Sequence, residues 1–286
     1  MFLFRCGLVN KRDGSSQKDL YGMKTLISWL KRIFGFKSSR STVPVARYAL
    51  VLGVERSARF GACPGARHDS LQMKKLLQDI AAVEYLSDTS ATRAHVVDMM
   101  KDLIEKVPED GIFILTYSGH GGSQRFADTH DEADGKDEYL CLYDTYLKDD
   151  DIWDMVTKCK GRVFLFFDCC HSETMFRAPM LPIIPPEDLL KEPEDDMCGV
   201  GIRDATIPAA PVDMLVWSGC PDNTFSYGDN AGGLFTNALL DALNRGKRTY
   251  KDIWSHIKAD KSLSQYAQKP QQTILGKFDV NNELWS

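Results

Sequence analysis

The 286-residue sequence has no run of 18 apolar residues, so we expect no membrane-spanning helix. Its first residues also lack an uninterrupted apolar stretch followed by a small-residue cleavage site, which argues against a secretory signal. The eight cysteines are scattered without the density of a disulfide scaffold, so reduced thiols are the simpler interpretation. There is no internal repeat. We therefore expect a globular protein in the cytoplasm, with a sizeable core.

The net charge of −5 is unevenly distributed along the chain. Residues 1–48 carry ten Lys or Arg against two acids, which leaves 25 basic and 38 acidic residues for the remainder. A basic arm on an acidic body predicts an N-terminal segment with a function of its own, or one that folds back onto the body. An acidic body argues against nucleic-acid binding.

Within the basic arm, residues 19–36 have apolar side chains at helical spacing with lysines and an arginine between them. One interpretation is an amphipathic helix that contacts a membrane surface or a partner. The other, which we favour, is a pro-segment helix packed on the body. Residues 37–45 are typical of a linker, so we divide the chain into a segment at 1–45 and a body at 46–286.

The body alternates apolar runs with stretches of helical periodicity, which predicts an α/β fold with a largely parallel sheet covered on both faces. We expect strands at 49–54, 112–117, 163–167 and 214–217, and helices at 69–81, 91–107, 153–159, 234–243 and 250–259. Residues 179–211 are rich in proline and acids and have no period. A loop of this length is usually functional or disordered.

Two of the predicted strands end in polar residues that could carry out chemistry. SGHGG at 118–122 follows the strand at 112–117, and DCCHS at 168–172 follows the strand at 163–167. If these strands are neighbours, both motifs open onto the same sheet edge, where ligands of parallel sheets bind. A histidine can activate a cysteine thiol and return its proton to a leaving group, while backbone N–H groups beside glycine face an oxyanion.

Each of these residues also has an ordinary structural interpretation. A single cysteine is usually an inert core residue, and a histidine next to glycine is usually a turn residue. A zinc site formed by Cys169, Cys170 and His171 is a weaker chemical option, because adjacent residues point in different directions and no second cysteine pair is present. The two motifs together favour the Cys–His interpretation.

The paired motifs YSGHG at 117–121 and DCCHS at 168–172 resemble those of the metacaspases, which are caspase-type cysteine peptidases. DEADGKDEYLCLYD at 131–144, WSGCPDN at 217–223, GGLFTNALLDAL at 232–243 and QKPQ at 268–271 extend the resemblance over most of 47–286. It implies a caspase-like fold for 46–286, with a large-subunit-like part at 46–178, a loop at 179–211 and a small-subunit-like part at 212–286.

The resemblance assigns the catalytic residues. The nucleophile is the cysteine directly before the histidine of DCCHS, which is Cys170, and the general base is His120. We expect the backbone at Gly121 to face the oxyanion, and peptide hydrolysis to proceed through a thioester.

It also implies that the peptidase cuts after Arg or Lys. The family's pocket for the basic side chain uses positions that match Ser118 and Asp168, together with an aspartate shortly before a helix. Asp69 fits that position, since carboxylates bind guanidinium and ammonium groups by charge-assisted hydrogen bonds. The alternative for Asp69 is a helix N-cap.

Many metacaspases are activated by calcium through aspartates. Asp137, Asp149 and Asp150 match such positions, and their oxygens suit this ion. The sequence departs from the family at Glu173 and Arg177, which puts the calcium site and the loop after the nucleophile in question. We expect no organic cofactor and a monomer.

We expect self-processing within the long loop, at Lys191 or Arg203, because these basic residues lie in an exposed, structureless stretch. Two alternatives remain for the function. One is a caspase-type preference for Asp, for which Arg67 or Arg125 would have to enter the pocket. The other is a non-catalytic scaffold or regulator that keeps the fold.

Overall fold

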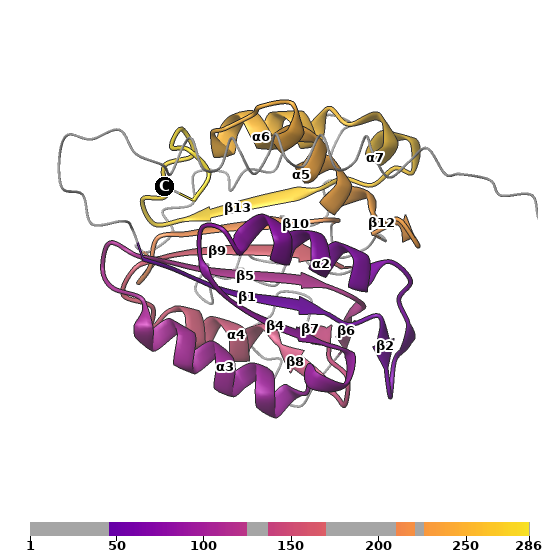
Figure 1. The fold of residues 1–286 in the computed structure, drawn as a ribbon, viewed down its shortest axis with the longest axis horizontal. Coiled ribbons are helices and arrows are strands. Elements are labelled where there is room, and N and C mark those ends of the chain that lie inside the picture. The colour runs from indigo at the N-terminus through magenta and orange to yellow at the C-terminus, as the bar shows by residue number, and fades with distance from the viewer. Residues whose placement is uncertain (1–45, 125–136, 170–209, 221–225, 286) are drawn as a thin grey trace, which may run out of the picture.

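The computed structural model describes residues 46–124, 137–169, 210–220 and 226–285, and the basic segment at 1–45 lies outside this part. Its centre is a six-stranded sheet in the order β13-β10-β9-β5-β1-β4 (Figure 1). These strands are β1 (Arg47–Gly53), β4 (Ala82–Ser87), β5 (Ile112–Ser118), β9 (Arg162–Asp168), β10 (Met214–Ser218) and β13 (Gln271–Leu275). All neighbours pair in parallel except β10 and β13, so the expectation of a mostly parallel sheet is confirmed.

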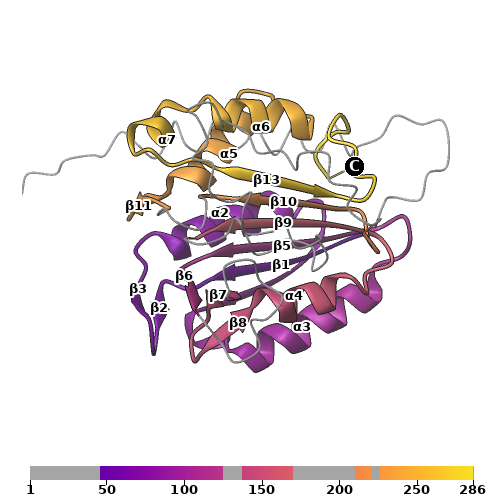
Figure 2. The same ribbon diagram turned by 180° about the vertical axis from the view of Figure 1, so that it is seen from behind.

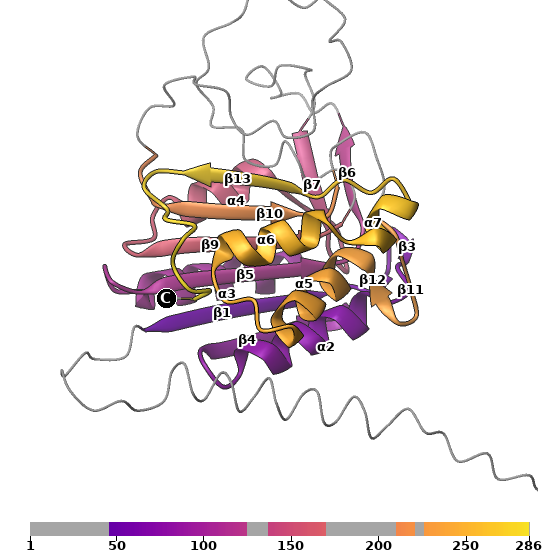
Figure 3. The same ribbon diagram turned by 90° about the horizontal axis from the view of Figure 1, so that it is seen from above.

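Helices cover both faces of this sheet (Figures 1 and 2). One face carries α2 (Ala66–Leu77), α5 (Leu234–Asn244) and α6 (Tyr250–Lys258), with α7 (Lys261–Gln265) beside them, and the other carries α3 (Arg93–Lys106) and α4 (Asp149–Val156). Figure 3 shows α6 lying over the sheet, with α5 and α7 beside it. No helix of the described residues is both long and apolar enough to cross a bilayer.

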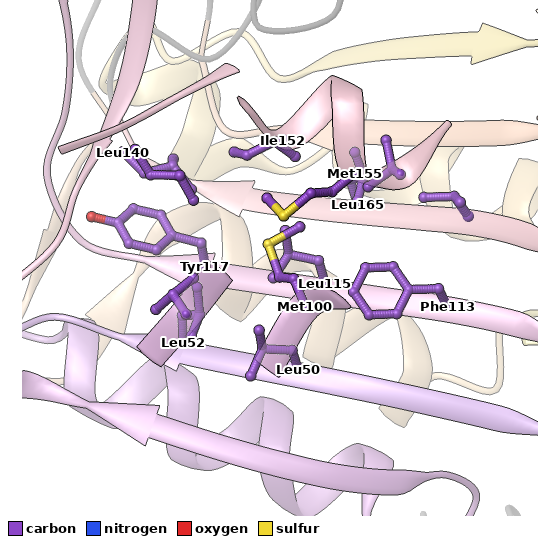
Figure 4. Close-up of a cluster of buried hydrophobic side chains, with 14 of the residues drawn as sticks. Leu50, Leu52, Met100, Phe113, Leu115, Tyr117, Leu140, Ile152, Met155 and Leu165 are labelled. Atoms are coloured by element: carbon purple, nitrogen blue, oxygen red, sulfur yellow. The ribbon is translucent and has the colours of Figure 1, made fainter. Parts of the chain in front are cut away.

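The alternation of strand side chains explains why the sequence reads as continuous apolar runs. In β1, Leu50 and Leu52 face the α3 side, whereas Ala49 and Val51 face the α2 side. The other central strands alternate in the same way, so both sets are buried. Figure 4 shows the α3 side, where Met100 packs against the strands.

Several elements differ from the sequence-based expectation. The helix expected at 69–81 is α2, which begins at Ala66, and the helix expected at 153–159 is α4, which begins at Asp149. Three consecutive aspartates suit the first turn of α4, because the helix dipole favours negative charge there. Edge strands β4 and β13 have mixed polarity, and we did not predict them.

Shorter elements complete the described part. β6 (Gly121–Gln124), β7 (Asp137–Cys141) and β8 (Tyr146–Lys148) form an antiparallel sheet that follows the histidine motif. Two small hairpins are formed by β2 (Arg56–Ser57) with β3 (Gly61–Ala62), and by β11 (Gly228–Asp229) with β12 (Gly232–Gly233). A 3-10 turn, η1 (Asp88–Ser90), follows β4. Both hairpins lie toward the end of the sheet where β1, β5 and β9 terminate (Figure 1).

Candidate active site

The two chemical motifs follow neighbouring strands. β5 and β9 pair in parallel, and Ser118 is the register partner of Asp168 at their last residues. Gly53, which ends β1, is in turn the partner of Ser118. The sheet therefore brings the first residues of SGHG and DCCHS to the same edge, as we expected from the sequence.

Asp69 reaches this edge from α2. Gly53 lets the helix approach, because a Cβ at this position would overlap the Ser70 hydroxyl and lie 3.2 Å from the carbonyl oxygen of Ala66. Ser118 Oγ donates a hydrogen bond of 3.0 Å to Asp69 Oδ2. The N-cap interpretation of Asp69 was wrong: the N-cap is Gly65, and Asp69 lies within the first turn of α2, where its side chain is 2% exposed.

The segment that contains β11, β12 and the start of α5 closes over both carboxylates. The Gly233 N–H lies 3.0 and 2.9 Å from the two carboxylate oxygens of Asp69. Asp168 Oδ2 accepts hydrogen bonds from the Thr236 N–H at 3.0 Å and the Thr236 hydroxyl at 2.7 Å. Ser226 Oγ donates to Asp168 Oδ1 at 2.6 Å. Both carboxylates are thus held by residues from the C-terminal part of the chain.

We did not predict Ser226, Gly233 or Thr236 as site residues. Gly233 and Thr236 lie in GGLFTNALLDAL, which carried only a family resemblance. Nothing in their residue types distinguishes them from the other hydroxyl and glycine residues of the chain. Their contacts with Asp69 and Asp168 in the folded structure are what identify these three residues as part of the site.

The two carboxylates disfavour each other's charge. Burial, together with the nearby charge of Asp168, raises the pKa of Asp69 to about 8. Burial also raises the pKa of Asp168, although the hydrogen bonds from Ser226 and Thr236 oppose this. The pair of carboxylates therefore retains a proton near neutral pH.

His120 lies two residues beyond the end of β5. Its Nε2 is 2.9 Å from the carbonyl oxygen of Ala62, at the end of β3. Because a carbonyl oxygen can only accept, Nε2 carries the proton, and the neutral ring then has a basic Nδ1. The main chain of His120 is also fixed, since its carbonyl oxygen accepts hydrogen bonds from the Tyr117 hydroxyl at 2.7 Å and the Cys141 N–H at 2.9 Å. Gly121, the next residue, begins β6.

The nucleophile candidate, Cys170, lies outside the described residues. Its neighbour Cys169 follows β9 directly, is 1% exposed and belongs to the hydrophobic core on the α3 side of the sheet. A substrate has no access to a thiol in that position. The choice of Cys170 as nucleophile stays a prediction.

A family model described as Caspase domain matches residues 46–277. The chain belongs to this family. The match confirms that the chain is a cysteine-type peptidase with a caspase-like α/β fold.

Curated relatives confirm the resemblance to metacaspases. Metacaspase-1 of Pyricularia oryzae is 28% identical over 84% of this chain and 74% of its own length. Metacaspase-1 of Schizosaccharomyces pombe is 25% identical over 86% of this chain and 71% of its own.

Solved structures support the fold of this caspase-domain chain. Protein GSU0716 from Geobacter sulfurreducens superposes with a TM-score of 0.64 at 25% identity, covering 84% of this chain and 98% of that one. Caspase-1 from Spodoptera frugiperda gives a TM-score of 0.53 at 16% identity over 84% and 95% of the two chains, which is a likeness of fold.

The aspartates expected to bind calcium lie elsewhere on this caspase-domain fold. Asp149 is buried at the first turn of α4, Asp150 beside it is exposed, and the Asp137 side chain lies outside the described part. Within the described ranges, no three Asp, Glu, His or Cys side chains are grouped as a metal site.

The other candidates are placed as follows. Lys191 and Arg203, the expected self-cleavage points, lie outside the described residues, as do His171 of the zinc option and Arg125. Arg67, the remaining arginine proposed for an Asp-specific pocket, is exposed on α2.

Proposed function

We propose that this caspase-domain peptidase is an endopeptidase that cuts after Arg or Lys, with Cys170 as nucleophile and His120 as base. The observation that supports it most is the pair of buried carboxylates, Asp69 and Asp168, at the strand edge that also leads to His120 and Cys170. A cationic side chain between them would offset their mutual repulsion. A substrate aspartate would add negative charge beside them and increase the repulsion.

The Asp-specific alternative requires a cation inside the pocket. Among the described arginines, Arg67 was the candidate, and its side chain is exposed on α2 rather than buried with Asp69. The neutral hydrogen-bond donors of the pocket are already engaged with the carboxylates. The arrangement therefore favours a guanidinium or ammonium ligand, which supplies several charge-assisted donors at once.

The chemistry follows from the protonation of His120. Its Nδ1 accepts the proton of the Cys170 thiol, and the thiolate attacks the carbonyl carbon of the scissile peptide bond. The negative charge that develops on the carbonyl oxygen is stabilised by the backbone at Gly121. The imidazolium then gives its proton to the leaving amine as the C–N bond breaks. Water, deprotonated by His120, cleaves the resulting thioester and releases the acid product.

Fluorogenic peptides that end in Arg, Lys, citrulline or Asp test this proposal. We expect the wild type to turn over the Arg and Lys peptides much faster than the citrulline and Asp peptides, and Cys170→Ala to lower kcat/KM at least about a thousandfold. Cys169→Ala is the matched control, because it removes the buried neighbouring thiol and should keep the activity. Preference for the Asp peptide would refute the pocket assignment. Equal and negligible turnover by the wild type and Cys170→Ala would favour the scaffold alternative.

Calcium activation stays a prediction, since the Asp137 side chain is outside the described part. The same Arg peptide, assayed with a calcium titration and with a chelator, decides it. We expect stimulation that Asp149→Asn weakens; equal rates with calcium and chelator would reject the requirement. Mass spectrometry of both samples shows whether cleavage after Lys191 or Arg203 accompanies the activity.

A further inference from the structure

Gln268 lies between α7 and β13 and is 3% exposed, although its side chain is an amide. Both ends of this amide are occupied. Oε1 accepts a hydrogen bond of 3.0 Å from the Tyr227 N–H, and Nε2 donates to the Gly219 carbonyl oxygen at 2.8 Å and to Ser226 Oγ at 2.9 Å. A buried amide with all these partners is strongly constrained in orientation.

The partners fix the direction of every bond in this network. The Tyr227 N–H can only donate and the Gly219 carbonyl can only accept, so the oxygen and nitrogen of the amide cannot be exchanged. The second Nε2 hydrogen then points to Ser226 Oγ, which must accept it. The Ser226 hydroxyl proton is therefore free to point at Asp168 Oδ1, 2.6 Å away. Gln268 thus orients the donor that holds one oxygen of the pocket carboxylate.

The main chain of Gln268 is anchored independently of this network. Its N–H donates to the Leu263 carbonyl oxygen at 2.9 Å, and Ala267 before it has a left-handed φ of 53°. The space beside the Ser226 hydroxyl and Asp168 is also tightly limited, because a Cβ at Gly219 would lie 2.9 Å from Ser226 Oγ and 3.2 Å from Asp168 Oδ1. In Figure 3, α7 lies at the end of the sheet that carries β11 and β12.

We propose that Gln268 is a positioning residue for recognition of the basic substrate side chain, acting through Ser226 on Asp168. It has no direct contact with Asp168 in this network, so its effect is indirect. The inference rests on the proposed Arg/Lys specificity. Without the amide, Ser226 is released to rotate, and Asp168 loses the donor that fixes Oδ1. The carboxylate then presents its charge to the guanidinium in a poorer geometry.

The experiment compares an Arg peptide with its citrulline analogue, which has the same shape without the charge. We expect Gln268→Met to raise KM for the Arg peptide roughly tenfold, as loss of a hydrogen bond to a charged group does, with kcat little changed. The ratio of kcat/KM values, Arg over citrulline, should fall by a similar factor. A purely structural role would lower the active fraction equally for both peptides, and titration of the active thiol measures that fraction.

Gln272→Met is the matched control. Gln272 lies on β13, and its Oε1 accepts a hydrogen bond of 2.8 Å from Trp217 Nε1, away from Asp168. Gln272→Met makes the same chemical change a few residues along the chain. It should leave the Arg-to-citrulline ratio unchanged. If Gln268→Met does not fold, Gln268→Glu, which keeps the side-chain length and loses both amide donors, replaces it.

A double-mutant cycle with Ser226→Ala tests the route of the effect. Because Gln268 acts through Ser226, the double variant should have the same Arg-to-citrulline ratio as Ser226→Ala alone. Additive effects, or an unchanged ratio in a folded Gln268 variant, would overturn the inference while leaving the Arg specificity of the wild type intact. A wild type that does not distinguish Arg from citrulline would instead overturn the proposed function.

Discussion

Two groups of acids in the described part of the molecule are built in opposite ways. Asp69 and Asp168 are 99 positions apart in the sequence and meet at the strand edge, where both are buried and surrounded by donors. Asp149, Asp150 and Asp151 are adjacent in the sequence, and the turn of α4 spreads them around the helix. Only the first of the three is buried.

This difference separates the proposed recognition site from a helix terminus. Burial and mutual repulsion raise the free energy of the charged pocket pair, so the pair gains from a cation. The α4 acids are stabilised by the helix dipole, and Asp151 forms a partly exposed ion pair of 2.8 Å with Arg93. Convergence of strand ends is thus stronger evidence for a pocket that binds a basic side chain than adjacency of acids in the sequence.

The largest expected effect comes from neutralising the pocket. Asp168→Asn removes a buried charge that pairs with the substrate cation, which costs about 3 kcal/mol, or roughly a hundredfold in kcat/KM for the Arg peptide. Asp151→Asn breaks a surface ion pair worth at most about 1 kcal/mol and should leave the kinetics unchanged. Steady-state kinetics of both variants measures the contrast. Equal losses of kcat/KM in the two variants would show that the two groups of acids do not differ in this way.

Sequence reasoning could predict one half of the pocket. Ser118 and Asp168 end strongly apolar strands, and parallel pairing then places them side by side. The donors that hold the carboxylates could not be predicted in this way. Ser226 and Thr236 meet Asp168 across 58 and 68 positions, and Gly233 meets Asp69 across 164. These contacts depend on how α5 and the β11–β12 hairpin pack, and no local periodicity encodes that packing.

A smaller effect is expected from adding a methyl group at the centre of the pocket. Gly233 has φ −72° and ψ 144°, which alanine adopts without strain, so Gly233→Ala changes only the packing. Its Cβ would overlap Asp168 Oδ2 and lie 2.8 Å from Cγ, so the carboxylate must move. Overpacking of this kind costs about 1–3 kcal/mol, and we expect KM for the Arg peptide to rise roughly tenfold. An unchanged KM in a folded variant would show that Asp168 tolerates displacement.

The smallest expected effect is the release of a proton when a basic ligand binds. This release distinguishes the two groups of acids directly. With a pKa of about 8, Asp69 is largely protonated at pH 7 in the empty pocket. A bound guanidinium favours the charged form and lowers this pKa, so binding should release up to about one proton at pH 7 and none well above pH 8.

Calorimetry of an Arg-ended peptide binding to the Cys170→Ala variant, in buffers of different ionisation enthalpy, measures this proton. Adding Asp69→Asn should abolish the release, whereas adding Asp150→Asn should not, because Asp150 is exposed on α4, which covers the other face of the sheet from α2. Release that persists without Asp69 would assign the proton to Asp168. The carboxylate that distinguishes the buried acid pair from the acids of α4 would then be Asp168 and not Asp69.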